Sequence, residues 1–250
     1  MVRSVSSSLR RPLLAVVVLL TTGAIALAQP PGDDAPKNLK VLPKDWTREQ
    51  VVNVMQNFTA ALGVGCNYCH VQKQGSPPDF PSDDKEEKRT ARAMMHIAQD
   101  LNARLPKDLD KPAAELTRIQ CITCHRGVPE PKQLAEILAK TSAEKGFAAA
   151  EAQYKDLKSK FYGAQAYDFS ENGLIATARP LIQRRTDEAL QFLDMNLELF
   201  PRSAESYVLK AEAQVVKNDK AGAMASLDKA LEIDPRNFGA RRAMNQLKGQ

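Results

Sequence analysis

The chain has 250 residues, of which 43% are apolar and 26% are charged, a composition typical of globular proteins rather than of disordered or fibrous ones. The formal charge is +5, and three of the cations, Arg3, Arg10 and Arg11, belong to the N-terminal segment. The rest of the chain is therefore close to neutral, which excludes the strongly basic balance expected of a nucleic-acid-binding protein.

The first 28 residues have the pattern of a secretory signal peptide. Their arginines precede a long apolar run that begins at Leu13, and the run ends in Ala-Leu-Ala, a typical cleavage site, at Ala28. The polar, proline-rich residues 29–38 indicate a linker. We therefore expect residues 1–28 to direct export to the periplasm and to be removed. The alternative is an uncleaved segment that anchors the chain in a membrane.

The first helix is expected just ahead of the first cysteine. Thr47 can cap its start, and Gln50 stands three residues later, where it completes a capping box. Gly63 follows the last residue of the apolar pattern and suits the end of a helix. One face of this helix collects Val51, Met55, Phe58 and Leu62, of which Met55 is the only methionine.

A second helix is expected over residues 82–105, where acidic side chains crowd the first turn. Its apolar face carries Met94, and Met95 lies beside that face. His96 falls on the polar side and is expected at the surface. The remaining positions of the apolar face are Ile97, Leu101 and Leu105.

All four cysteines of the chain stand in two copies of one motif, Cys-x-x-Cys-His. The copies are Cys66, Cys69 and His70, and Cys121, Cys124 and His125. A zinc site would have its cysteine pairs closer together in sequence, and a thioredoxin-like site would follow a strand rather than a helix. Disulfide bonds fit an exported protein but leave both histidines without a role. The motifs therefore predict two covalent haem c groups, in which the thiols bind the porphyrin and the histidine binds the iron as proximal ligand.

The second axial ligand cannot be histidine for both irons, because the chain has only three histidines. Met55 precedes Cys66 by eleven residues on the expected helix, so we assign it to the first haem. Met94 is assigned to the second haem from its place on the apolar face, with Met95 and then His96 as the alternatives.

These residues resemble the cytochrome subunit of photosynthetic reaction centres. The resemblance covers residues 39–131 and rests on the stretches LPKDWTREQVVNVMQNFTAALGVGCNYCHV, KRTARAMMHIAQDLN and CITCHRGVPEP. It implies a repeated unit of helix, turn and haem motif, in which a methionine of the helix is the sixth ligand of the iron. By that pattern Met55 serves the first haem and Met94 the second, and the function is electron transfer.

The chain also departs from that family. The family subunit carries four haem motifs, whereas this chain has two. The histidine that the family places after its second methionine helix has no counterpart in the stretch LPKDLDKP, residues 105–112. We therefore carry over haem binding and electron transfer but not photosynthesis, and we expect a redox protein of a respiratory chain as the partner.

From residue 132 onward cysteine and histidine are absent and alanine-rich helical patterns take over. Residues 132–169 predict two connecting helices. Residues 170–250 resemble tetratricopeptide (TPR) repeats with a final capping helix, because apolar and proline positions recur every 34 residues. The recurring pairs are Ala189 and Ala223, Leu193 and Leu227, Leu197 and Leu231, and Pro201 and Pro235.

The sequence thus predicts an all-α protein with a two-haem cytochrome domain, residues 39–131, and a short helical-repeat module. We expect an electron carrier without enzymatic activity that docks on its redox partner through the repeats. Two alternatives stay open. One is a two-haem enzyme such as a peroxidase, which needs an open iron site with acid–base groups beside it. The other is a scaffold or sensor in which the haems are structural.

Overall fold

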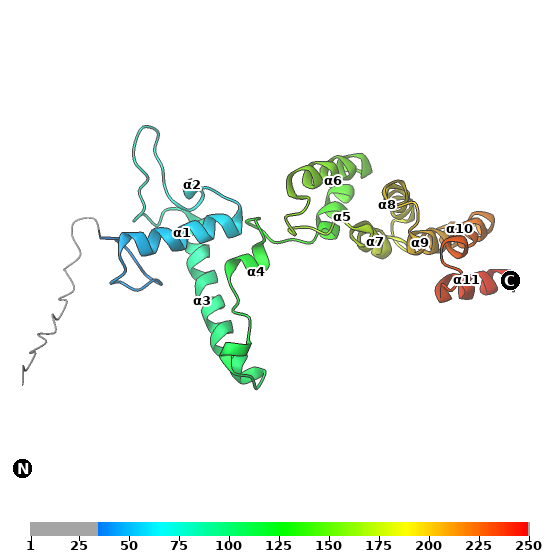
Figure 1. Ribbon diagram of the computed structural model, residues 1–250. Coiled ribbons are helices and arrows are strands. Elements are labelled where there is room, and N and C mark those ends of the chain that lie inside the picture. The colour runs from blue at the N-terminus through cyan, green and yellow to red at the C-terminus, as the bar shows by residue number, and fades with distance from the viewer. Residues whose placement is uncertain (1–34, 250) are drawn as a thin grey trace, which may run out of the picture. The chain divides into compact units, whose positions relative to one another are not determined.

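The computed structural model describes residues 35–249, so the expected signal peptide, residues 1–28, lies outside the described chain. Within the described residues the regular secondary structure is helical, apart from one isolated bridge between Val71 and Asp79, and the expected all-α fold is confirmed (Figure 1). None of these helices is both long and apolar enough to cross a membrane. In chain order the elements are α1 Arg48–Leu62, α2 Cys66–Cys69, α3 Glu86–Asp108, η1 Ala113–Glu115, α4 Cys121–His125, α5 Leu134–Lys145, α6 Phe147–Phe161, α7 Glu171–Ala178, η2 Arg179–Leu181, α8 Thr186–Leu199, α9 Ala204–Val216, α10 Lys220–Ile233 and α11 Phe238–Lys248.

Helix α1 begins and ends as its sequence predicts. The Gln50 N–H donates to the Thr47 hydroxyl (3.3 Å), and the Thr47 N–H donates to the Gln50 side chain (2.8 Å), which is the complete capping box. Gly63 ends the helix in the left-handed region, with φ of 66°, where a residue without Cβ is favoured. The helix therefore ends at Leu62, and only three residues separate it from Cys66 and the first cysteine motif.

Helix α3 is offset from the expected range of 82–105. It starts at Glu86, because Ser82 is used in the preceding turn, where its hydroxyl accepts from the Asp84 N–H (3.2 Å). It continues past Pro106 to Asp108. A proline in the last turn lacks one N–H and costs the helix one hydrogen bond, which is tolerated there more easily than in the interior.

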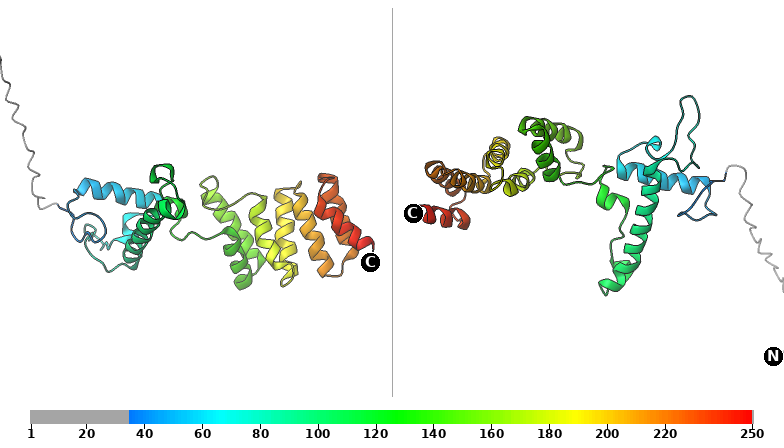
Figure 2. Two further views of the ribbon diagram at one scale, coloured as in Figure 1. Left: turned by 90° about the horizontal axis from the view of Figure 1, so that it is seen from below. Right: turned by 180° about the vertical axis from the view of Figure 1, so that it is seen from behind.

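From α5 onward the helices pack side by side in a row (Figure 2). Helix α5 packs on both α6 and α7, and from α7 to α11 each helix packs on the next. The connecting helices share one hydrophobic cluster with the helices that follow, since Leu138 and Tyr154 pack with Leu174 and Phe192. Residues 132–169 thus contribute to the same core as the helices that follow them. A second cluster joins α9, α10 and α11 through Val208, Leu227 and Met244, among others.

The spacing of 34 residues recurs in the helices themselves. Helices α8 and α10 start at 186 and 220 and end at 199 and 233, so both bounds are shifted by 34. The paired side chains are equally buried: Ala189, Ala223, Leu193 and Leu227 are all fully inaccessible to solvent. Helix α7, by contrast, is short and runs into the turn η2, which contains Pro180.

The core is distributed very unevenly along the chain. In residues 36–131 only Ala61 and Val128 are buried apolar side chains, whereas the remaining buried residues all follow residue 132. Helix α3 has 23 residues and buries none of them. A segment of this length is ordinarily held together by a hydrophobic core, so these helices need something else to pack against.

Candidate functional site

The first cysteine motif lies on the single-turn helix α2. Cys66 is exposed and Cys69 is half-buried. Burial raises the pKa of the Cys69 thiol, and the nearby Glu87 carboxylate raises it further. His70 ends the helix in an extended conformation, and its buried Nδ1 finds no hydrogen-bond partner among the described residues. The ring of Phe80 meets His70 edge to face, with 5.1 Å between centroids.

The pKa of His70 is lowered, first because the ring is partly buried and then because Lys88 is near. Both effects favour the neutral imidazole. A neutral imidazole keeps a lone pair on one nitrogen, which is the form in which histidine binds a metal ion.

The second cysteine motif lies on helix α4, which begins at Cys121 and ends at His125. His125 Nδ1 is 2.9 Å from the carbonyl oxygen of Val128. Because a carbonyl can only accept, Nδ1 carries the proton and Nε2 keeps its lone pair. A backbone carbonyl that fixes the ring and its tautomer in this way is the usual partner of a metal-binding histidine. Arg126 and Gly127 then turn the chain away, both with positive φ (49° and 90°).

A cavity of about 300 Å³ brings the two motifs together with helix α3. From the second motif it is lined by Cys121 and His125, and from the first by Cys69. Met94 and Met95 line it as well, so both candidate methionines face the same space as His125. Met55, half-buried on α1, is not among its lining residues, although Phe58 and Leu62 of the same helix are. The cavity has an acidic rim, which is formed by Glu86, Glu87 and Glu130.

The apolar face of α3 is left uncovered by protein. The exposed fractions of Met94, Ile97 and Leu101 are 44%, 50% and 38%, which is unusual for three apolar side chains on one face. Met95 is half-buried beside them, and His96 is exposed, as its position on the polar side predicts.

Each cysteine motif packs against the helix that precedes the other motif. Helix α1, which precedes the first motif, packs against α4 of the second motif, and α2 packs against α3. At the α1–α4 crossing the Gly127 N–H donates to the Ala61 carbonyl (2.8 Å). A Cβ on Gly63 would stand 2.1 Å from the Gly127 oxygen, so the two backbones approach closely enough to require glycine at 63.

Asp83 anchors the loop between α2 and α3. Its carboxylate accepts from Asn38 (2.9 Å) and pairs with Lys40 (2.6 Å) and Arg92 (2.6 Å), while Lys88 lies at 3.3 Å. Hydrogen bonds from Lys40 and Asn38, followed by those of the other two cations, hold the pKa of Asp83 well below its usual range. The carboxylate thereby ties the segment ahead of α1 to helix α3.

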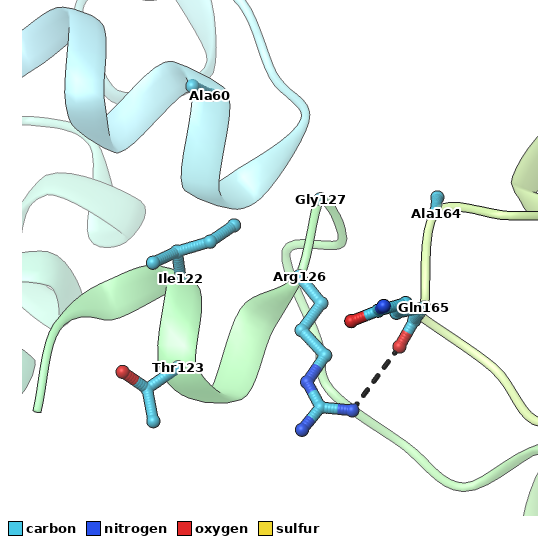
Figure 3. Close-up of a pocket in the computed structure, with 7 residues that line it drawn as sticks. All are labelled: Ala60, Ile122, Thr123, Arg126, Gly127, Ala164 and Gln165. Carbon is cyan, nitrogen blue, oxygen red and sulfur yellow. Dashed lines mark hydrogen bonds between the residues drawn. The ribbon is translucent and has the colours of Figure 1, made fainter. Parts of the chain in front are cut away.

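A second hollow, of about 430 Å³, lies behind the α1–α4 crossing (Figure 3). Ala60 of α1 and Ile122 of α4 line it on one side, and Ala164 and Gln165 on the other. The Arg126 guanidinium donates to the Gln165 carbonyl across 3.4 Å. The hollow contains none of the predicted haem ligands.

Comparison with known proteins identifies the family. The family model described as "Photosynthetic reaction centre cytochrome C subunit" matches residues 14–186. The chain belongs to this family. Members of this family bind covalent haem c and transfer electrons.

Individual relatives match only part of the chain. Cytochrome c-554 of Chloroflexus aurantiacus is 37% identical over 81 residues, which are 32% of this chain and 18% of that protein. The photosynthetic reaction center cytochrome c subunits of Rubrivivax gelatinosus and Thermochromatium tepidum are 32% and 34% identical, over 33% and 41% of this chain. The chain spans only 24% and 23% of their lengths.

The residues present fit a haem of c type. The second motif offers paired thiols and a histidine with Nε2 free, and both methionines reach the same cavity. A large apolar group would cover the exposed apolar face of α3 and would supply the core that residues 36–131 otherwise lack. Sequence reasoning missed three contributors to the site. Asp83 and Asn102 contact residues that are distant along the chain. Val128 lies only three residues after His125 but acts through its backbone carbonyl.

Proposed function

We propose that the chain is an exported dihaem cytochrome c that carries electrons between redox proteins. The haem supplies a one-electron ferric–ferrous couple. The observation that carries the proposal is the cavity in which Cys121 and His125 meet Met94 and Met95, in a chain that belongs to a haem-binding family. The cysteines that would attach the two haems are Cys66 and Cys69, and Cys121 and Cys124.

The proximal ligands in this proposal are His70 and His125. His125 holds its proton at Nδ1 through the Val128 carbonyl and presents Nε2 to the iron. His70 has its Nδ1 buried and its ring packed on Phe80, so it too is restricted in orientation. These restraints on the two histidine rings would hold them in place as ligands, an arrangement that would favour electron transfer over ligand exchange.

The distal ligands in this proposal are Met55 for the first haem and Met94 for the second, with Met95 as the alternative to Met94. A methionine sulfur favours ferrous iron and raises the reduction potential. Met94 is the more exposed of the adjacent pair and lies on the uncovered face of α3, so a haem seated on that face would cover it.

The domain organisation that we propose starts with a signal peptide, residues 1–28, and a linker, residues 29–38. The dihaem domain comprises residues 39–131, connecting helices residues 132–169, and TPR-like repeats with a capping helix residues 170–250. The periplasm is the proposed location, with membrane association only if the signal is retained. The repeats would dock on the redox partner, which we place in a respiratory chain.

The decisive experiment compares the full chain with Met55→Ala, Met94→Ala and Met95→Ala. Haem staining of denatured protein and an iron count should give two covalent haems in each. A redox titration should show a lower midpoint for one haem in Met55→Ala and for the other in one of the two remaining variants. Val54→Ala, next to Met55 and also half-buried, controls for lost packing.

Two outcomes would count against the proposal. Fewer than two haems in the unmodified protein would remove the dihaem assignment, and unchanged spectra in all three methionine variants would remove the ligand assignment. Binding of carbon monoxide to either reduced haem would favour an enzyme with an open iron site over an electron carrier.

A further inference from the structure

Asn102 is joined to the backbone just ahead of the second cysteine motif. Its side-chain Oδ1 accepts from the Ile119 N–H at 2.8 Å, and its Nδ2 donates to the Ile119 carbonyl at 2.8 Å. Nδ2 also donates to the Ala98 carbonyl, one turn back on α3, at 2.7 Å. Both ends of the amide are therefore used, and they satisfy both backbone groups of one residue, as a neighbouring strand would.

The position of this contact matters because of what lies on either side of it. Asn102 is two turns along α3 from Met94 and Met95, which line the cavity. Ile119 is followed by Gln120, which caps α4 through a hydrogen bond from its N–H to the Thr123 hydroxyl (3.0 Å). The first residue of α4 is Cys121, so the hydrogen bonds between Asn102 and Ile119 hold the chain two residues ahead of the second motif.

The second motif needs such a contact to define its distance from the methionines of α3, whereas the first motif does not need one to define its distance from Met55. Between Met55 and Cys66 the chain consists of the rest of α1 and the tight turn at Gly63, so the covalent chain itself sets their separation. Between α3 and α4 the chain leaves the helix and returns through residues 109–120, in which the only regular element is the short turn η1. A long return loop does not define where it ends, because its backbone has many conformations of similar energy.

We infer that Asn102 is a positioning residue for the second haem, one that sets the register between the methionines of α3 and the motif of Cys121 to His125. The inference rests on the proposed function, since it assumes a haem at that motif. Asn102 acts through the Ile119 backbone and does not itself line the cavity. Its loss should therefore alter the ligand geometry of one haem and leave the other unchanged.

The experiment uses the full-length, haem-loaded protein and the variants Asn102→Ala and Asn102→Asp. Alanine removes both hydrogen bonds to Ile119, and aspartate keeps an acceptor for the Ile119 N–H but places an oxygen opposite the Ile119 carbonyl. Gln99→Ala is the control, because Gln99 is an exposed residue of the same helix. The readouts are haem stoichiometry, a redox titration, the absorption band of methionine sulfur bound to ferric iron, and amide hydrogen exchange at Ile119.

Both Asn102 variants should keep two covalent haems and shift the midpoint of a single haem, the one that also responds to Met94→Ala or Met95→Ala. The methionine–iron band should lose intensity for that haem alone. Loss of one to two hydrogen bonds should speed exchange of the Ile119 amide on the order of three- to tenfold or more. Gln99→Ala should match the unmodified protein in every readout.

Three results would overturn the inference. The first is two attached haems whose potentials and spectra do not change in either Asn102 variant. The second is an equal shift of both haems, which a general loosening of the fold would produce. The third is the same shift in Gln99→Ala. Absence of a second haem from the unmodified protein is a different result, because it would refute the proposed function and not the role of Asn102 in holding Ile119, which the exchange measurement tests separately.

Discussion

Gly63 is the glycine of residues 39–131 at which an added methyl group should reduce stability most. Alanine there meets two penalties. The left-handed backbone, with φ of 66°, costs an L-residue about 1–2 kcal/mol. The new Cβ would also stand 2.1 Å from the Gly127 oxygen and 2.9 Å from its carbonyl carbon, both backbone atoms that cannot rotate away. Forcing such a contact apart typically costs about 1–3 kcal/mol.

The separation of α1 from α4 carries a further cost. The hydrogen bond from the Gly127 N–H to the Ala61 carbonyl spans 2.8 Å at the same crossing, and its loss should cost about 0.5–1.5 kcal/mol. We therefore expect Gly63→Ala to reduce the free energy of unfolding by about 2.5–6.5 kcal/mol.

Gly75→Ala separates the two penalties. Gly75 has a similar φ of 76°, but a Cβ there has no neighbour within 4 Å, so only the backbone cost of about 1–2 kcal/mol applies. The measurement is urea unfolding of the haem-loaded protein, followed by far-UV circular dichroism and by haem absorbance. If Gly63→Ala loses no more stability than Gly75→Ala, the close approach of α1 and α4 is not the tight contact that the structure describes.

Three further outcomes are expected. The pKa of Asp83 is depressed in the folded protein, so its carboxylate contributes fully to stability when the pH is above the ordinary pKa of aspartate, and the contribution is lost as the pH drops below about 4. Asp83→Asn should therefore flatten the profile of unfolding midpoint against pH in that range. An unchanged profile would argue against the ion pairs of Asp83 with Lys40 and Arg92. The buried hydroxyl of Tyr154 has no hydrogen-bond partner among the described residues, so Tyr154→Phe should change the free energy of unfolding by less than about 1 kcal/mol or raise it, and a large loss would reveal a missed partner. Leu193→Ala and Leu227→Ala should each cost about 2–5 kcal/mol and add in the double variant, because the two fully buried leucines belong to separate clusters; a cost below about 1 kcal/mol for either would contradict their equivalence.

Much of the local structure could be predicted because its causes lie within a few residues. Thr47, Gln50 and Gly63 define the ends of α1 through short-range hydrogen bonds and one backbone conformation. The 34-residue spacing predicts the matching bounds of α8 and α10, because identical patterns bury identical faces. The cysteine motifs are equally local, since each places two thiols on one turn of helix and a histidine at its end.

The contacts that assemble the site could not be predicted in this way. Asn102 meets Ile119 across a loop whose course no local pattern defines, and the partner of His125 is a backbone carbonyl, which every residue possesses. In the sequence Asp83 is one of several acidic residues ahead of α3, and only the structure shows that Lys40 and Arg92 pair with it. The helix-face pattern also favoured Met94 over Met95, whereas both reach the cavity.

The packing of the second motif on α1, the helix that precedes the first motif, has a consequence for the order in which the protein folds. Synthesis proceeds from the N-terminus, so Cys66 to His70 are complete while the segment that forms α4 is still to come. The face of α1 that α4 covers, including the Gly63 turn, remains open during that interval. The α1–α4 crossing therefore cannot close until the second motif has been made.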